Sequence, residues 1–308
     1  MTIKLFSDLE WPLPKKFQSP KKGEIIINND SKDQYIIGKR INNGNFGNVY
    51  ECWDEWGNEL VAKVLKPNNQ TYKKVREDWE KELNKLITLR HPNITYIYDC
   101  FEYRNTFYLI LERCHRTFKE MIEIYKYEND FLDYLFPYIA RDILQAIHFI
   151  HQVGYVHKDL HLGNVFVHLV KDKLLPDNTP VWIFKIGDLG ISNLEADIDI
   201  FNTTLAAWML PPEYLDPQEY AIKDNGEYRL TKQIDIYHTG LLLLSVLLGY
   251  TPPFTEQEIL QGSPRQMAEN LPLPYGQAIA KALRRHVEFR TQTALKFWQD
   301  IKAAIPST

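Results

Sequence analysis

Cysteine is scarce in this sequence of 308 residues, and neither sign of charge dominates it. The three cysteines, Cys52, Cys100 and Cys114, are odd in number and widely spaced, which argues against a disulfide framework or a zinc site. The formal net charge is −4, so bulk charge gives no reason to expect a nucleic-acid partner. Because free thiols persist in reducing compartments, we expect a cytoplasmic protein.

Long apolar runs are missing as well. The most apolar run, G-L-L-L-L-S-V-L-L-G at 240–249, is too short to span a bilayer, which needs about 20 residues. The first residues show no basic region followed by an apolar run, so we expect no signal peptide. We therefore expect no membrane partner, and we interpret 240–249 as part of a buried helix.

The composition that is present is typical of a globular protein with a substantial core, with 44% apolar and 25% charged residues. Residues 1–34 contain prolines and clustered lysines and are interpreted as an N-terminal arm that could hold one strand at 24–27. Short β-type runs follow at 35–41, 48–53, 60–65, 94–101 and 107–112. After residue 112 the patterns become long and helical, so we expect an α+β chain with a boundary near 112–116.

Three segments have helical patterns. Trp79, Leu83, Leu86 and Ile87 recur at spacings of three and four, and this helix should end before Pro92. Longer helices are expected at 134–151 and 234–248. The segment at 171–182 is interpreted as a solvated surface loop, with an interaction site as the alternative, and the role of the N-terminal arm is left open.

A glycine-containing segment, I-N-N-G-N-F-G-N-V-Y at 41–50, lies between two predicted strands. Gly44 and Gly47 would let the backbone approach a phosphate closely, because they carry no Cβ. A plain hairpin explains the same residues equally well.

Lys63 lies on the next predicted strand, within V-A-K at 61–63. An inward-facing Lys needs an anionic partner, because burying an unpaired ammonium is costly. Glu82, on the following helix, could supply that partner, and a phosphate could supply a second. The alternative is a solvated Lys at a sheet edge.

Two carboxylates and an amide are the remaining candidate functional groups. Asp159 and Asn164 lie five positions apart, ahead of the strand V-F-V at 165–167, and Asp188 follows a strand in K-I-G-D-L-G at 185–190. Asp159 could accept a proton from a hydroxyl, while Asn164 and Asp188 offer the hard oxygen ligands that Mg²⁺ prefers. Taken singly, these segments could also be turns or chance matches.

In chain order the motifs resemble the signature of the protein kinase family. The resemblance covers residues from about 35 to 301. The matching segments are V-A-K at 61–63, Glu82 nine residues before H-P-N-I at 91–94, H-K-D at 157–159, D-L-G at 188–190, P-P-E at 211–213, D-I-Y-H-T-G at 235–240 and T-P-P-F at 251–254. Arg290 stands where the family places an Arg that pairs with the Glu of this P-P-E segment, Glu213. Their joint order indicates a kinase fold.

The resemblance implies a bilobal α+β architecture. An arm at 1–34 would precede a kinase domain at 35–303, and a tail would follow at 304–308. Residues 35–112 would form a small antiparallel sheet with one helix, and residues 113–303 a larger, mostly helical lobe. ATP would lie in the cleft.

The resemblance also implies roles for single residues. Asp159 would be the catalytic base, Lys63 would contact the α- and β-phosphates, and Glu82 would hold Lys63. Asn164 and Asp188 would hold Mg²⁺. Further ATP contacts would come from Ile41, Gly44, Gly47, Val49, Ala62, Leu111, Glu112, Cys114 and Phe166. The implied activity is that of an ATP- and Mg²⁺-dependent protein Ser/Thr kinase, whose protein substrate and oligomeric state the sequence leaves open.

Several positions depart from the family pattern. Asn42 replaces the first glycine of the loop, and Lys158 replaces an Arg. Leu189 replaces a Phe, and Pro211 replaces an Ala. His161 stands where Ser/Thr-directed kinases usually carry a Lys that contacts the transferred phosphate. This last departure is the most consequential.

Two alternatives stay open. D-L-H-L-G-N at 159–164 also resembles the loop of small-molecule phosphotransferases such as the aminoglycoside and choline kinases. The counterparts of A-P-E, of the helix start and of H-P-N-I favour a protein kinase instead. A pseudokinase scaffold is the other alternative, but its usual marker is the loss of a residue equivalent to Lys63, Asp159 or Asp188.

Overall fold

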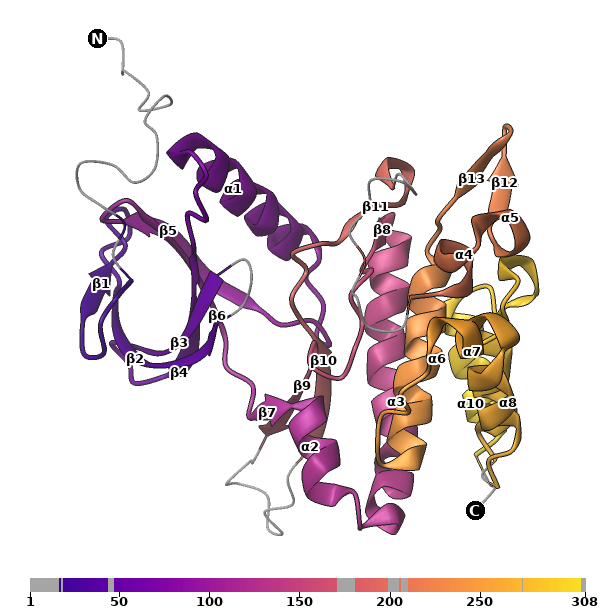
Figure 1. The fold of residues 1–308 in the computed structure, drawn as a ribbon. Helices are drawn as coiled ribbons and strands as arrows, with labels where there is room; N and C mark the ends of the chain where they lie inside the picture. Colours follow the sequence, from indigo (N-terminus) through magenta and orange to yellow (C-terminus); the bar gives the residue numbers. More distant parts are fainter. Residues whose placement is uncertain are drawn as a thin grey trace. The chain divides into compact units, whose positions relative to one another are not determined.

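The computed structural model describes residues 17, 19–43, 47–170, 181–198, 205, 210–272 and 274–305. The chain forms two compact units, coloured along the sequence in Figure 1. The sheet unit comprises Met1–Arg90 and Thr95–Arg113, and the helical unit comprises His91–Ile94 and Cys114–Thr308. Two hydrogen bonds hold His91–Ile94 in the helical unit: Asn93 Nδ2 donates to Phe184 O at 3.0 Å, and Ile186 N donates to Asn93 O at 2.8 Å.

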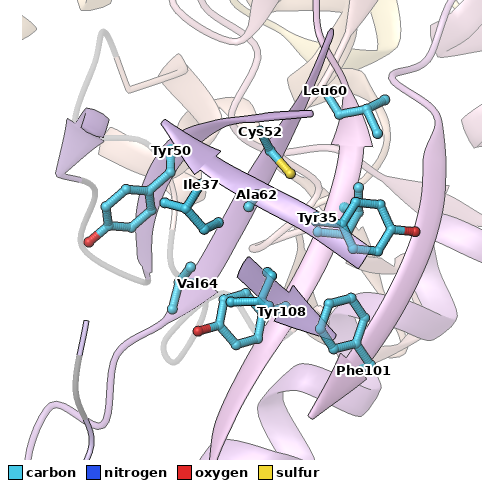
Figure 2. Close-up of a cluster of buried hydrophobic side chains, with 11 residues drawn as sticks. Tyr35, Ile37, Tyr50, Cys52, Leu60, Ala62, Val64, Phe101 and Tyr108 are labelled. Atoms are coloured by element: carbon cyan, nitrogen blue, oxygen red, sulfur yellow. The ribbon is translucent and has the colours of Figure 1, made fainter. Parts of the chain in front are cut away.

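The sheet unit is built on antiparallel strands in the order β1-β2-β3-β4-β6-β5. The strands are β1 (Ile25–Ile27), β2 (Gln34–Asn43), β3 (Gly47–Asp54), β4 (Glu59–Leu65), β5 (Ile97–Tyr103) and β6 (Thr106–Glu112). Figure 1 shows the sheet strongly curved. Apolar side chains from each of these strands form the core drawn in Figure 2.

Side chains tie the two edge strands of this sheet together. Asn28, just after β1, donates to both carboxylate oxygens of Asp99 on β5 at 2.9 and 3.0 Å. Arg104, in the β5–β6 turn, forms a 2.9 Å ion pair with Glu24. The end of the predicted arm is therefore part of the sheet unit, and the strand expected at 24–27 is confirmed as β1.

Helix α1 (Tyr72–Thr88) follows β4 in the sheet unit. Thr71 caps its N-terminus by accepting from Lys74 N at 3.3 Å. Trp79 Nε1 donates to Tyr108 O on β6 at 3.1 Å, which fixes the rotation of the helix on the sheet. The predicted helix is confirmed, but its predicted apolar face is partly wrong, because Ile87 is exposed and Glu82 is buried.

The helical unit combines α-helices with short strands. Its α-helices are α2 (Phe118–Tyr125), α3 (Asn129–Gln152), α4 (Pro212–Leu215), α5 (Pro217–Tyr220), α6 (Gln233–Leu248), α7 (Glu256–Gln261), α8 (Ser263–Glu269), α9 (Gly276–Ala282) and α10 (Ala294–Ala303). Its strands are β7 (Arg116–Thr117), β8 (Tyr155–Val156), β9 (Val165–Val170), β10 (Val181–Ile186), β11 (Asn193–Leu194), β12 (Ile222–Asp224) and β13 (Glu227–Arg229).

Helix α6 lies at the centre of the helical unit. Its residues from Gln233 to Val246 are buried on every side, as expected for a helix that is largely apolar all round. It packs against α3 and α9, and it ends at Gly249, whose φ of 69° favours glycine. The expected buried helix at 234–248 is confirmed. In the part of the chain that the structure describes, no helix combines the length and the apolar character needed to cross a bilayer.

The predicted α+β architecture is confirmed, with an antiparallel sheet and one helix in the described part of the sheet unit and a mostly helical second unit. The strand expected at 94–101 starts only at Ile97, because Ile94 instead forms a parallel bridge to Ile186. Of the link at 171–182, Val181 and Trp182 begin β10, and the other residues lie outside the described ranges.

Candidate active site

Lys63 and Glu82 form a buried ion pair within the sheet unit. Lys63 projects from β4, and its Nζ lies 2.6 Å from Glu82 Oε1 on α1. Only 10% of the Lys63 side chain and 11% of the Glu82 side chain are exposed. The attraction between the two opposite charges offsets the free-energy cost of removing each of them from water. The predicted pairing is therefore confirmed.

The strands place other predicted ATP contacts around Lys63. Val49 on β3 is the cross-strand partner of Lys63, and Leu111 on β6 is the partner of Val61, which lies two residues before Lys63. Ala62 is fully buried, in the core drawn in Figure 2. Strands β3, β4 and β6 thus hold four of the predicted residues close together in the sheet, namely Val49, Ala62, Lys63 and Leu111.

The glycine-containing segment is described in part. Gly44 lies outside the described residues. A Cβ on Gly47 would lie 2.7 Å from Val64 O, so only glycine fits there without a shift of the backbone. Ile41, on β2, is exposed. Close packing of β3 on β4 therefore accounts for Gly47 independently of any ligand.

Of the three remaining predicted ATP contacts, one belongs to the sheet unit and two belong to the helical unit. Glu112 ends β6; its N–H donates to Tyr96 O at 2.8 Å, and its Oε2 accepts from Tyr96 N at 3.2 Å. Cys114 and Phe166 belong to the helical unit and are half-buried, with Phe166 on β9. The predicted ATP contacts are therefore divided between the two units.

In the helical unit, Asp159 and Asn164 close a short loop ahead of β9. Asn164 Nδ2 donates to the backbone oxygen of Asp159 and to its Oδ2, both at 2.9 Å. Asn164 O accepts from Gly187 N at 2.9 Å, which joins this loop to the segment that carries Asp188. The structure thus connects the three polar residues that the sequence singled out.

The acidic groups influence each other. Burial raises the pKa of Asp159 above its ordinary value, and the neighbouring Asp188 adds to this, although His161, His157 and the Asn164 bond act in the opposite direction. Asp188 is exposed and has a φ of 53°. The exposed carboxylate of Asp188 and the amide oxygen of Asn164 are hard oxygen donors of the kind that suits a divalent cation.

A buried carboxylate on α6 fixes the backbone of the loop. Asp235 accepts from His157 N at 2.8 Å and from Lys158 N at 2.9 Å, and it lies 2.8 Å from His151 Nε2. Burial acts to raise the pKa of Asp235, but these partners outweigh it and hold the pKa below its ordinary value. Sequence reasoning assigned Asp235 to a helix start and missed this contact, which motif spacing alone does not show.

His161 lies within the same loop. Its Nδ1 accepts from Gly163 N at 3.0 Å, and its Nε2 lies 3.5 Å from Asp159 Oδ1. Burial lowers the pKa of this imidazole, although Asp159 acts in the opposite direction. The sequence marked His161 as a departure but gave no signal of these contacts.

Arg290 and Glu213 form a second buried ion pair, within the helical unit. Arg290 Nη1 and Nη2 donate to Glu213 Oε1 and Oε2 at 2.7 and 2.8 Å. The pairing expected from the resemblance is confirmed.

Comparisons with known proteins identify the family of this chain. The family model described as "Protein kinase domain" matches residues 35–303. The chain is 26% identical over 254 residues to the "Probable serine/threonine-protein kinase PLK" of Dictyostelium discoideum, covering 80% of this chain and 24% of that protein. It is 25% identical over 278 residues to the "Serine/threonine-protein kinase PLK2" of Mus musculus, covering 88% of this chain and 38% of that protein.

A yeast protein gives a similar match. The "Cell cycle serine/threonine-protein kinase CDC5/MSD2" of Saccharomyces cerevisiae is 26% identical over 234 residues, covering 76% of this chain and 30% of that protein. The chain thus spans 24% to 38% of the length of these three curated relatives. Because the family model covers most of the sequence, the chain belongs to the protein kinase domain family.

Proposed function

We propose that this chain is an active kinase that transfers the γ-phosphoryl group of ATP to Ser and Thr hydroxyls of proteins. Membership of the protein kinase domain family supports the chemistry, and the names of the relatives, which are serine/threonine-protein kinases, support the acceptor. The observation that carries the proposal is the Asp159–Asn164 hydrogen bond, in a loop joined to the Asp188 segment through Gly187.

Asp159 is the proposed catalytic base. Its Oδ2 accepts from Asn164 at 2.9 Å, so the carboxylate has a preferred orientation before any substrate binds. Phosphoryl transfer needs little covalent chemistry from the protein, and orientation of the acceptor hydroxyl is a main requirement. Asp159 would accept the hydrogen bond, and then the proton, of that hydroxyl.

Asn164 and Asp188 are the proposed Mg²⁺ ligands. Asn164 uses Nδ2 for both bonds to Asp159, which leaves Oδ1 as the atom suited to a metal. Asp188 supplies an exposed carboxylate. When bound, Mg²⁺ would neutralise charge on the phosphates. The role of the two residues would be to hold it beside the base.

Lys63 is the proposed contact to the α- and β-phosphates. Glu82 Oε1 lies 2.6 Å from its ammonium nitrogen and so fixes the position of the ammonium. The other proposed ATP contacts are Ile41, Gly44, Gly47, Val49, Ala62, Leu111, Glu112, Cys114 and Phe166. A cytoplasmic location is also a proposal, supported by three cysteines that are all free thiols.

A direct test is incubation with γ-labelled ATP and Mg²⁺, in separate reactions with generic protein acceptors, an aminoglycoside and choline. Mass spectrometry then locates any phosphate on the chain itself or on the acceptors. We expect label on Ser or Thr of proteins and none on the small molecules. Asp188→Ala should abolish nearly all transfer, while Asp224→Ala, which removes an exposed carboxylate on the β12–β13 hairpin, should leave it unchanged.

Each contrary outcome identifies a different error. Label on the aminoglycoside or choline alone would show a small-molecule phosphotransferase. No transfer with either Mg²⁺ or Mn²⁺ would show a scaffold without catalysis. Full activity in Asp188→Ala would remove this residue from the metal site.

A further inference from the structure

The loop around the proposed base contains an imidazole whose orientation is fixed by the backbone. His161 Nδ1 accepts from Gly163 N at 3.0 Å. A ring nitrogen that accepts a hydrogen bond carries no proton, so the proton of the neutral ring is on Nε2. That atom faces Asp159 Oδ1 at 3.5 Å. The donor nitrogen of the ring therefore lies near the carboxylate that the proposed function makes the base.

Gly163 makes this ring position possible. A Cβ built on Gly163 would lie 2.8 Å from Cε1 of His161, closer than real Cβ atoms essentially ever come, and 3.0 Å from Nδ1. Any other residue at 163 would push the ring away from its present position. His161 and Gly163 thus act together, since the missing side chain admits the imidazole.

The two oxygens of the Asp159 carboxylate face different donors. Oδ2 accepts from Asn164 Nδ2 at 2.9 Å, and Oδ1 faces His161 Nε2 at 3.5 Å. The second separation is long for a hydrogen bond, but catalytic contacts of this kind often tighten when substrate binds. Rotation of this carboxylate about its Cβ–Cγ bond would break the hydrogen bond from Asn164 and would move Oδ1 away from His161 Nε2.

We propose that His161 is a positioning residue for Asp159, which fixes the plane of the base through its Nε2–H. The inference rests on the proposed function and adds a role at a position where the resemblance leads one to expect a Lys. A neutral imidazole contributes a directed donor here, where a Lys would contribute a mobile positive charge. His161 would therefore affect the rate of transfer more than the binding of ATP.

The first test measures the tautomer and needs no activity. The full chain, labelled with ¹⁵N-histidine, is studied by long-range ¹H–¹⁵N correlation, and the His161 signals are assigned by their loss in His161→Gln. We expect a neutral ring with the proton on Nε2. A proton on Nδ1, or rapid exchange between the two tautomers, would overturn the inference.

The second test uses a matched pair of variants. His161→Gln can place an amide donor near the position of Nε2, whereas the shorter His161→Asn can still accept from Gly163 N but cannot reach Asp159. We expect His161→Gln to keep kcat within about 3-fold, and His161→Asn to lose about 10- to 100-fold in kcat. The KM for ATP should stay within about 3-fold in both. Gly163→Ala should behave like His161→Asn, since it displaces the ring.

The outcomes separate this inference from the proposed function. The positioning role alone would be overturned if His161→Asn transferred phosphate at the wild-type rate. It would also be overturned if His161→Gln and His161→Asn lost activity equally. Absence of transfer by the wild-type chain, with the Nε2–H tautomer present, would overturn the proposed function and with it the role of Asp159 as a base to be positioned.

Discussion

Each unit has a buried ion pair between a basic and an acidic side chain, and the two pairs differ in how far they are enclosed. In the sheet unit, the Lys63 and Glu82 side chains are 10% and 11% exposed. In the helical unit, the Arg290 and Glu213 side chains are 0% and 1% exposed. A fully enclosed pair can serve only the fold, while a pair that keeps some surface can also meet a ligand.

The hydrogen bonds of Arg290 are consistent with a structural role. Besides the two bonds to Glu213, its Nε donates to Arg284 O at 2.9 Å, Nη1 donates to Gln233 O at 2.8 Å and Nη2 donates to Arg285 O at 3.2 Å. The planar guanidinium therefore joins the P-P-E segment, the start of α6 and the segment after α9. Arg suits such multidentate geometry, and Lys does not.

Replacing Arg290 should give the largest loss of stability. Arg290→Met leaves the Glu213 carboxylate buried without a counter-charge, and we expect the free energy of unfolding to fall by about 3 to 5 kcal/mol. Urea denaturation followed by far-ultraviolet circular dichroism measures it. Adding Glu213→Gln should restore part of the loss, because the buried charge is then removed. A loss below about 1 kcal/mol, typical of an exposed pair, would contradict the structural role.

Replacing Lys63 should affect activity more than stability. Lys63→Met should lower kcat/KM for ATP by about 100-fold or more, which corresponds to about 2.7 kcal/mol of transition-state stabilisation. We expect the free energy of unfolding to fall by only about 1 to 2 kcal/mol, because Glu82 keeps some access to solvent. Initial rates of transfer and urea denaturation of the same preparation provide both values. An unchanged kcat/KM would remove the functional difference between the two ion pairs.

Ion pairs on the surface of α1 should contribute least. Lys74 Nζ lies 2.9 Å from Asp78 Oδ1, but the two side chains are 45% and 38% exposed. Lys74→Ala should therefore change the free energy of unfolding by less than about 0.5 kcal/mol and leave transfer unaffected. The same denaturation and rate measurements test this. A loss as large as that expected for Arg290→Met would mean that exposure is a poor guide to the role of these ion pairs.

The sequence predicted the elements whose signals are local. Helix α6 (Gln233–Leu248) starts and ends within one residue of the predicted 234–248, because a continuous apolar run leaves little choice of boundary. Strands β3 and β4 match the predicted runs at 48–53 and 60–65 to within one residue at each end, and Gly57 in the turn between them has a φ of 78°, which glycine adopts at little cost. The Lys63–Glu82 contact could be predicted because an inward Lys requires an acid.

Other features depend on tertiary contacts and could not be predicted in this way. Ile87 fits the apolar repeat of α1 but is exposed, since the buried face of the helix includes Glu82, which contacts Lys63. The strand expected from residue 94 starts later because Ile94 belongs to the helical unit. The β12–β13 hairpin was not predicted, because its strands are only three residues long.

In the candidate site, too, some features could be predicted from the sequence and others depend on tertiary contacts. Motif spacing pointed to Asp159, Asn164 and Asp188, whose segments the structure joins by hydrogen bonds. It did not reveal the support of the loop by Asp235, nor the contact of His161 with the proposed base. Those contacts follow from where a helix and a ring are packed, and motif spacing does not contain that information.

The central claim, that Asp159 acts as the base of a phosphoryl transfer, is tested most directly by single-turnover transfer from γ-labelled ATP in Asp159→Asn. The substitution keeps the size of the side chain and an oxygen for the Asn164 bond, but it removes the proton acceptor. We predict a fall of the transfer rate by about 10³-fold or more, with ATP binding within a few-fold of wild type. Transfer by Asp159→Asn at the wild-type rate would contradict the account.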